Sequence, residues 1–235
     1  MNRSLQRGAT LIIVLCIVLL VTIIATVAIR QSSVSLNIAT GAQAQKLMMQ
    51  NSDAALLRFE QLHKQNSSAA VNSLFSTIKK NIGKEVVWCY SDLQRDFFTL
   101  NNSSLIYWIA GNTQATTIGN DGFCRSNSFS TGRSTVVTQV AATISLTNSS
   151  VITNSSSNDN SVPPVKIIVY TTSFIPTLST ANADAINACL STRVSGRPTY
   201  VNKTESNPQT YTVSECLSAL NVPNYTAVAE YQSEN

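Results

Sequence analysis

The stretch ATLIIVLCIVLLVTIIATVAI, residues 9–29, holds 21 residues without a charged side chain. At about 1.5 Å per residue, a helix of this length spans about 31 Å, which matches the hydrocarbon core of a bilayer. Arg3 and Arg7 precede the stretch, and basic residues next to a membrane helix stay on the cytoplasmic side. The sequence therefore predicts one membrane-spanning helix, with the rest of the 235-residue chain outside the cytoplasm.

A cleaved secretory signal peptide is the alternative for this segment. Its apolar region is normally about 7–15 residues long and ends at a small-x-small cleavage site. Ala25, Ala28 and Ser32 provide small residues for such a site. However, the uncharged run is longer than a signal peptide needs, and no proline occurs before Pro163. We therefore expect the apolar helix to be retained.

The helical pattern continues beyond the membrane segment. Apolar residues recur after Arg30 at steps of three, four or seven, at Ile38, Ala42, Met49, Leu56 and Phe59. This spacing predicts one helix over residues 9–65, about 85 Å long. Residues 9–29 form its membrane half, and residues 30–65 form an amphipathic half that packs on a globular domain.

Four runs rich in Val, Ile, Thr and aromatic residues predict β-strands in the remainder. They are residues 85–90, 105–110, 135–146 and 165–174. The intervening segments 90–102, 111–132 and 147–164 are rich in Ser, Asn, Thr and Gly, which favours loops. The last of these loops would join two antiparallel strands.

Short helices are expected at three further places. Residues 67–82 predict a helix or helical loop, residues 180–192 a helix capped by Ser179 or Thr180, and residues 213–220 a helix that ends near Pro223. Together these patterns predict an α+β fold. The long amino-terminal helix would pack on an antiparallel sheet in a head formed by residues 66–235.

Five cysteines divide by location. Cys16 lies in the membrane run, whereas Cys89, Cys124, Cys189 and Cys216 lie in the exported region. An oxidising compartment favours disulfides, and no exported cysteine has the Cys-x-x-Cys spacing of a metal or redox site. Three pairings are open. We prefer Cys89–Cys124 and Cys189–Cys216, because each sequential pair closes a loop of about thirty residues, worth about 3–4 kcal/mol.

Residues 6–12 read QRGATLI, a short basic leader that ends in glycine and runs directly into an apolar helix. This junction resembles the class III leader of type IV pilins and type II secretion pseudopilins. The resemblance implies that residues 1–8 are a leader, which a prepilin peptidase removes after Gly8. It also implies methylation of the new amino terminus at Ala9.

Ile13 stands at the fifth mature position, where this family usually carries Glu. In this respect the chain resembles the PilX minor pilins and the K-type minor pseudopilins, and residues 50–56, QNSDAAL, resemble their QAAEAAL segment. The PilX pilins are the closer match, over about the first sixty residues. In the family, the Glu is thought to meet the amino terminus of the preceding subunit. An Ile13 subunit is thus expected at the filament tip, where no subunit precedes it.

The resemblance implies a type IV pilin-like fold and a minor pilin that promotes or primes type IV pilus assembly in a tip complex, supporting adhesion and twitching motility. The implied partners are other minor pilins, the major pilin, the prepilin peptidase and a candidate tip adhesin. The protein would lie in the bacterial inner membrane before it enters the pilus. The alternatives are a K-type pseudopilin of a type II secretion system, whose larger inserted helical domain has little room here, and a single-pass membrane-anchored binding protein or enzyme.

The chain offers little for catalysis. His63 is the only histidine and lies on the predicted long helix, so a Ser-His-Asp or Cys-His site in the head is not expected. We expect no enzyme activity, no cofactor and no metal. Asp92, Asp96 and residues 158–160 offer oxygen atoms for calcium, which K-type pseudopilins bind, but neither group matches a calcium loop. A net charge of +4 with 12% charged residues does not favour nucleic-acid binding.

Overall fold

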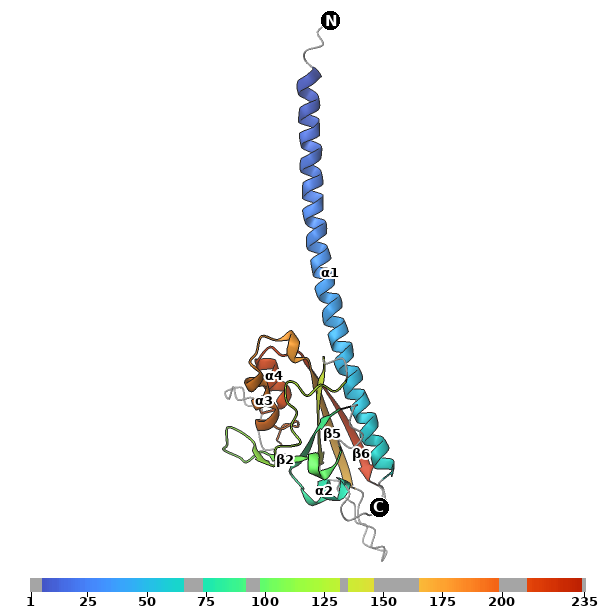
Figure 1. Ribbon diagram of the computed structural model, residues 1–235, viewed down its shortest axis with the longest axis vertical. Coiled ribbons are helices and arrows are strands. Elements are labelled where there is room, and N and C mark those ends of the chain that lie inside the picture. The colour runs from blue at the N-terminus through green and yellow to red at the C-terminus, as the bar shows by residue number, and fades with distance from the viewer. Residues whose placement is uncertain are drawn as a thin grey trace, which may run out of the picture. The chain divides into compact units, whose positions relative to one another are not determined.

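The computed structural model describes residues 6–65, 74–91, 98–131, 135–145, 165–198 and 211–233. The chain forms two compact units, Met1–Ala44 and Gln45–Asn235. The second unit is called the head from here on. It contains all elements after α1 and, in addition to the expected residues 66–235, the end of α1 (Figure 1). Asp92, Asp96 and residues 158–160, the candidate calcium ligands, lie outside the described residues.

The amino-terminal helix α1 runs without interruption over Gln6–Gln65, which confirms the expected long helix. In the described part of the chain, it is the one helix long and apolar enough to cross a membrane. Its large apolar side chains in the first unit are exposed, for example Leu11 and Ile24. Such a surface suits contact with lipid or with other apolar helices, because exposing these side chains to water is unfavourable.

The head contains an antiparallel sheet of six strands in the order β3-β2-β1-β4-β5-β6. The strands are β1 (Glu85–Tyr90), β2 (Ser104–Tyr107), β3 (Thr116–Ile118), β4 (Val137–Ile144), β5 (Val165–Phe174) and β6 (Asn224–Ser233). The prediction of an antiparallel sheet is confirmed, and β1 and β5 have the predicted bounds. The long strand β5 pairs with β4 on one side and with β6 on the other.

Three predictions about strands need correction. Strand β2 ends at Tyr107 rather than at residue 110, because a turn follows in which Asn112 N–H donates to the Ile109 carbonyl and Gly111 has φ +90°. Strand β3 lies within the predicted loop 111–132, and β6 lies where no strand was predicted. Both are edge strands, so each is defined by pairing with one neighbour rather than by a strong local pattern.

One face of the sheet packs against residues of α1 that belong to the head. Buried side chains of α1, of the short helix α2 (Leu74–Lys80) and of β1, β4 and β5 form one apolar cluster. Its members are Ala55, Phe59, Phe75, Ile78, Val86, Trp88, Tyr90, Phe98, Val140, Ala142, Ile167 and Val169. The alternation of side chains along β1 places Val86, Trp88 and Tyr90 on this face.

The opposite face carries α3 (Ala183–Thr192) and α4 (Val213–Ala219), which lie side by side in Figure 1. A disulfide between Cys189 and Cys216 joins these two helices, and a second joins Cys89 of β1 to Cys124. The preferred pairing is therefore the one in the structure. Cys16 is a free, exposed cysteine on α1.

The predicted cap of α3 was wrong. The helix begins at Ala183, and the Asn182 side chain caps it by accepting a hydrogen bond from Asp184 N–H at 3.1 Å. A short 3-10 turn at Pro176–Leu178 precedes it, and the Ser179 hydroxyl accepts from Ala181 N–H instead. The cap thus lies a few residues later than the sequence suggested, although the helix itself was predicted.

Candidate functional site

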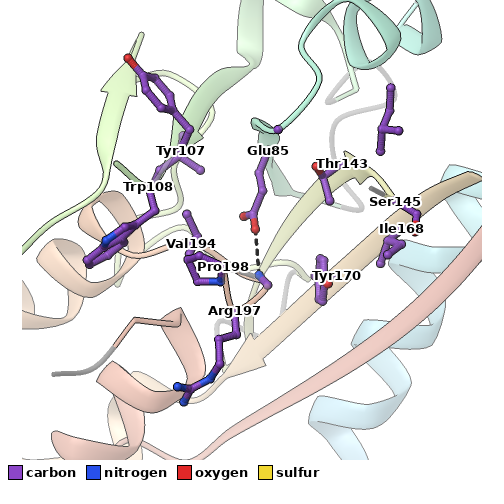
Figure 2. A pocket seen from close by; sticks show the side chains of 14 residues that line it. Glu85, Tyr107, Trp108, Thr143, Ser145, Ile168, Tyr170, Val194, Arg197 and Pro198 are labelled. Carbon is purple, nitrogen blue, oxygen red and sulfur yellow. Dashed lines mark hydrogen bonds between the residues drawn. The ribbon is translucent and has the colours of Figure 1, made fainter. Parts of the chain in front are cut away.

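A cavity of about 310 Å³ lies in the head, on the face of the sheet opposite α1 (Figure 2). Glu85 of β1 lies across from Ile106 of β2, so both side chains point to this face. Thr143 of β4 and Tyr170 of β5 also line the cavity. The segment Val194 to Pro198, called the strap below, closes one side of it.

Glu85 is the central polar group of this cavity. Its side chain is buried, and its two carboxylate oxygens accept short hydrogen bonds from consecutive backbone N–H groups of the strap. Ser195 N–H donates to Oε2 at 2.7 Å, and Gly196 N–H donates to Oε1 at 2.8 Å. Figure 2 shows the carboxylate pointing toward the strap. The bonds therefore fasten the strap to the first residue of β1.

Burial raises the pKa of Glu85 to about 7, although the Ser195 and Gly196 N–H groups act in the opposite direction. The neighbouring Tyr170 is affected too, since burial and then the charge of Glu85 raise the pKa of its phenol. Gly196 packs so closely on this ring that an added Cβ would lie 2.6 Å from the Tyr170 Oη. A larger residue at this point of the strap would therefore require the Tyr170 ring to move.

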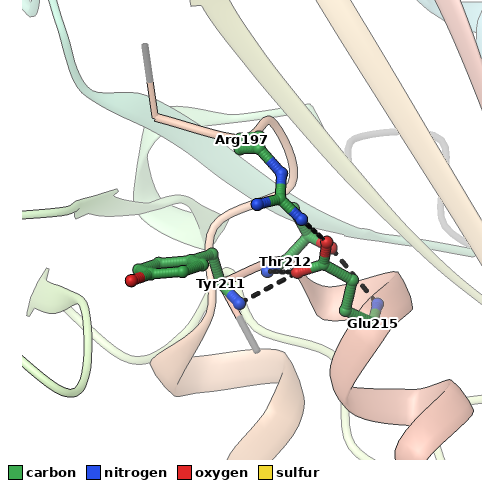
Figure 3. Close-up of polar contacts among 4 residues, drawn as sticks. All are labelled: Arg197, Tyr211, Thr212 and Glu215. Carbon is green, nitrogen blue, oxygen red and sulfur yellow. Dashed lines mark hydrogen bonds and ion pairs between the residues drawn. The ribbon is translucent and has the colours of Figure 1, made fainter. Parts of the chain in front are cut away.

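A second polar cluster anchors the strap at its other end (Figure 3). Glu215 of α4 accepts hydrogen bonds from Tyr211 N–H at 3.0 Å and Thr212 N–H at 3.1 Å, and it forms an ion pair with Arg197. The Arg197 guanidinium also lies 5.8 Å from the centre of the Tyr211 ring. Burial alone would raise the pKa of Glu215, but the two N–H groups and Arg197 outweigh it and lower that pKa.

This second cluster, called the Arg197 cluster below, has a structural role, because its two charged groups, Arg197 and Glu215, pair with each other. The Thr212 hydroxyl accepts from Glu215 N–H at 3.2 Å, so that Thr212 and Glu215 form a capping box on α4. The strap also joins this region by a parallel bridge between Val194 and Thr212. These contacts hold the strap at Val194 and at Arg197, whereas Glu85 holds the two residues between them, Ser195 and Gly196.

Glu85, in contrast, has no cationic partner among the described residues. The ion pairs among the described residues are Lys166–Glu230 and Arg197–Glu215, and neither involves Glu85. Within the same residues, no group of three or more His, Cys, Asp or Glu side chains is placed to hold a metal ion. The carboxylate of Glu85 thus lines the cavity, and the hydrogen-bond partners that the described residues provide for it come from the strap.

The residues predicted from sequence are not part of this cavity. Gly8 and Ala9 have helical backbone in α1, and Ile13 is exposed on the same helix. Their predicted roles in processing and assembly stay predictions. His63 lies on α1, as expected, but its side chain is outside the described residues.

No sequence pattern described above points to Glu85, Tyr170, Arg197 or Glu215 as site residues. Glu85 is the first residue of the strand EVVWCY. A single carboxylate at the start of an apolar strand is only a weak indication of a buried polar site. The sequence TVSE at residues 212–215 matches the capping-box pattern and could have been found. The contact of Glu85 with the strap joins residues more than one hundred positions apart, which no local pattern shows.

Known proteins offer no further guide to this site. The chain matches no family model, no curated protein and no solved structure. Function must therefore be argued from the chain's own residues.

Glu85 makes the stability of the head depend on pH. Because its pKa rises from 4.5 to about 7 on folding, its contribution to stability is fully present below about pH 4.5 and is lost as the pH rises through 7. This corresponds to a loss of about 3 kcal/mol between pH 4 and pH 8. Glu85→Gln, which stays uncharged, should remove this part of the pH dependence in chemical denaturation of the full chain in detergent micelles.

The matched control is Glu230→Gln, which removes an exposed carboxylate that pairs with Lys166. The loss of stability that Glu85 causes as the pH rises through 7 should remain in this variant. If Glu85→Gln also left the profile unchanged, the carboxylate would titrate alike in the folded and unfolded chain, and burial would not control it.

Proposed function

We propose that this protein is a minor pilin of the PilX type, which promotes or primes type IV pilus assembly. The observation that carries this proposal is the form of α1. It is one continuous helix over Gln6–Gln65, and its uncharged run, residues 9–29, begins directly after Gly8, at the junction that resembles a prepilin leader. A helix that first crosses a membrane and then packs among other such helices needs this apolar surface.

The head supports the same proposal. The part of α1 in the head packs on an antiparallel sheet, and two disulfides fit an oxidising compartment outside the cytoplasm. Among the described residues of the head, the helices after α1 are short, with seven residues in α2, ten in α3 and seven in α4. This favours a PilX-type pilin over a K-type pseudopilin with its larger helical insertion.

In this proposal the role of the protein is structural, with no enzyme activity. The apolar half of α1 anchors the subunit in the inner membrane and later packs in the filament core. The head contacts other minor pilins, the major pilin and, at the tip, an adhesin. Surface attachment and twitching motility then follow from pilus assembly.

Processing at the leader is the direct test. Intact-mass and amino-terminal peptide analysis of protein from native membranes, under non-reducing conditions, should find N-methylated Ala9 as the first residue and all four head cysteines oxidised. Gly8→Val is the control, since the resemblance implies that it blocks cleavage and retains Met1. An intact Met1 in the unmodified protein, or cleavage near Ser32, would exclude a pilin.

The tip position is tested separately at Ile13. Ile13→Glu should give several-fold fewer pili by electron microscopy, because a carboxylate in the apolar part of α1 is costly unless it is paired. Ile13→Leu keeps the surface apolar and should assemble normally. If the Glu variant assembled pili at the normal level, the reason for placing this subunit at the tip would be lost.

A further inference from the structure

We propose that the Glu85 cavity binds a lysine side chain of a partner protein, whose ammonium group pairs with the Glu85 carboxylate. This inference does not depend on the proposed function. It begins from the position of Glu85, which is buried at the cavity while no Lys or Arg of the described residues pairs with it. A buried carboxylate without a cation is costly, and a cation that enters the cavity lowers that cost.

The cations already nearby have partners of their own. Arg197 pairs with Glu215, and the Arg193 guanidinium lies 5.9 Å from the centre of the Trp108 ring. Lys84, next in sequence to Glu85, lies with its Nζ 5.0 Å from the centre of the Tyr107 ring. Tyr170 also faces Glu85, and its phenol can donate a hydrogen bond but carries no positive charge.

The geometry of the carboxylate favours lysine over arginine. Each oxygen already accepts one strap N–H, at 2.7 Å and 2.8 Å. A planar guanidinium binds a carboxylate best by donating one N–H to each of its two oxygens. The strap N–H groups already use part of the accepting capacity of both oxygens. An ammonium group needs only one free lone pair on either oxygen, and its flexible stem can lie along apolar walls. In Figure 2, Trp108 and Tyr170 lie on either side of Glu85 and provide such walls.

The surroundings of the cavity favour a protein partner over a free small amine. Tyr170, which lines the cavity, lies across from Val228 of β6, and Val228 is 58% exposed on the same face of the sheet. Ile168 of β5 also lines the cavity. An exposed apolar residue beside a charged cavity adds contact area that only a larger partner can cover. Strand β6 is also an edge of the sheet. Among the described strands it pairs with β5 alone, so its other side can accept an extended segment of a partner.

Binding can be measured on the full chain in detergent micelles, with ¹⁵N-labelled glycine to follow the Gly196 amide. The probes are the peptide acetyl-Val-Lys-Val-amide, its neutral analogue with norleucine in place of lysine, and n-butylamine. The lysine peptide should shift the Gly196 signal, and the norleucine peptide should not. Because Glu85 must be ionised, binding should be about tenfold tighter at pH 8 than at pH 6.

Three variants complete the test. Glu85→Gln should weaken the lysine peptide at least about tenfold, since it removes a hydrogen bond to a charged group. Asp184→Asn is the matched control, since it removes an exposed carboxylate on α3 that does not line the cavity, and it should keep the affinity. Val228→Ser should weaken the peptide but not n-butylamine, which separates a protein partner from a small amine.

The outcomes that overturn the proposal are distinct. Equal binding of the norleucine peptide, full affinity in Glu85→Gln, weaker binding at pH 8 than at pH 6, or no binding of the lysine peptide would each exclude a lysine site. Equal binding of n-butylamine and the peptide, both insensitive to Val228→Ser, would exclude a protein partner.

Discussion

Replacing Phe59 with alanine is expected to lower the free energy of unfolding by about 3–5 kcal/mol. Phe59 is fully buried in the cluster between α1 and the sheet. Its ring centre lies 5.6 Å from that of Phe75, 5.5 Å from that of Phe98 and 5.4 Å from that of Tyr231. These rings come from separate parts of the chain, so they cannot all move into the space that the variant leaves.

The measurement is urea denaturation of the full chain in micelles, followed by tryptophan fluorescence. Trp88 is a suitable reporter because it belongs to the same cluster. Leu57→Ala is the matched control, since Leu57 lies on the same helix but is 59% exposed, and it should change stability by less than about 0.5 kcal/mol. A loss below about 1.5 kcal/mol for Phe59→Ala would mean that α1 contributes little to holding the head together.

The long helix and the central strands could be predicted because their signals are local. Residues 9–29 are uncharged, and later apolar residues of α1 recur at helical spacing. Strands β1 and β5 are rich in Val, Ile, Thr and aromatic residues, and their bounds were predicted correctly. In each case the residues that form the element also carry the pattern.

The edge strands could not be predicted for the opposite reason. Strand β6 has the sequence NYTAVAEYQS, which follows Pro223 and contains two alanines, so its own propensity for a strand is weak. It is extended because all ten of its residues pair with β5. Strand β3 has only three residues and depends on β2 in the same way.

The candidate site shows the same limit. The disulfide pairing could be ranked from loop lengths, and Thr212 with Glu215 carried a recognisable capping pattern. The role of Glu85 depends on the strap, which follows α3, and on Tyr170 of β5. Only the folded chain brings these residues together, so no local sequence pattern points to Glu85.

Removing the Cys189–Cys216 disulfide is expected to lower the free energy of unfolding by about 3–4 kcal/mol. The bond closes a loop with a sequence separation of 27 residues, and without it the unfolded chain regains that conformational freedom. The double variant Cys189→Ala/Cys216→Ala tests this in the denaturation assay described above. Both cysteines pack with Ile186, Leu190 and other side chains of α3 and α4, so some loss of packing adds to the effect.

Cys16→Ala is the matched control, because Cys16 is free and exposed on α1 and closes no loop. It should leave the unfolding of the head unchanged. Adding a reductant to the unmodified protein should lower stability at least as much as the double variant, because it also opens Cys89–Cys124. If the double variant lost less than about 1 kcal/mol, the apolar contacts between α3 and α4 would already restrict this part of the unfolded chain, and the disulfide would add little to them.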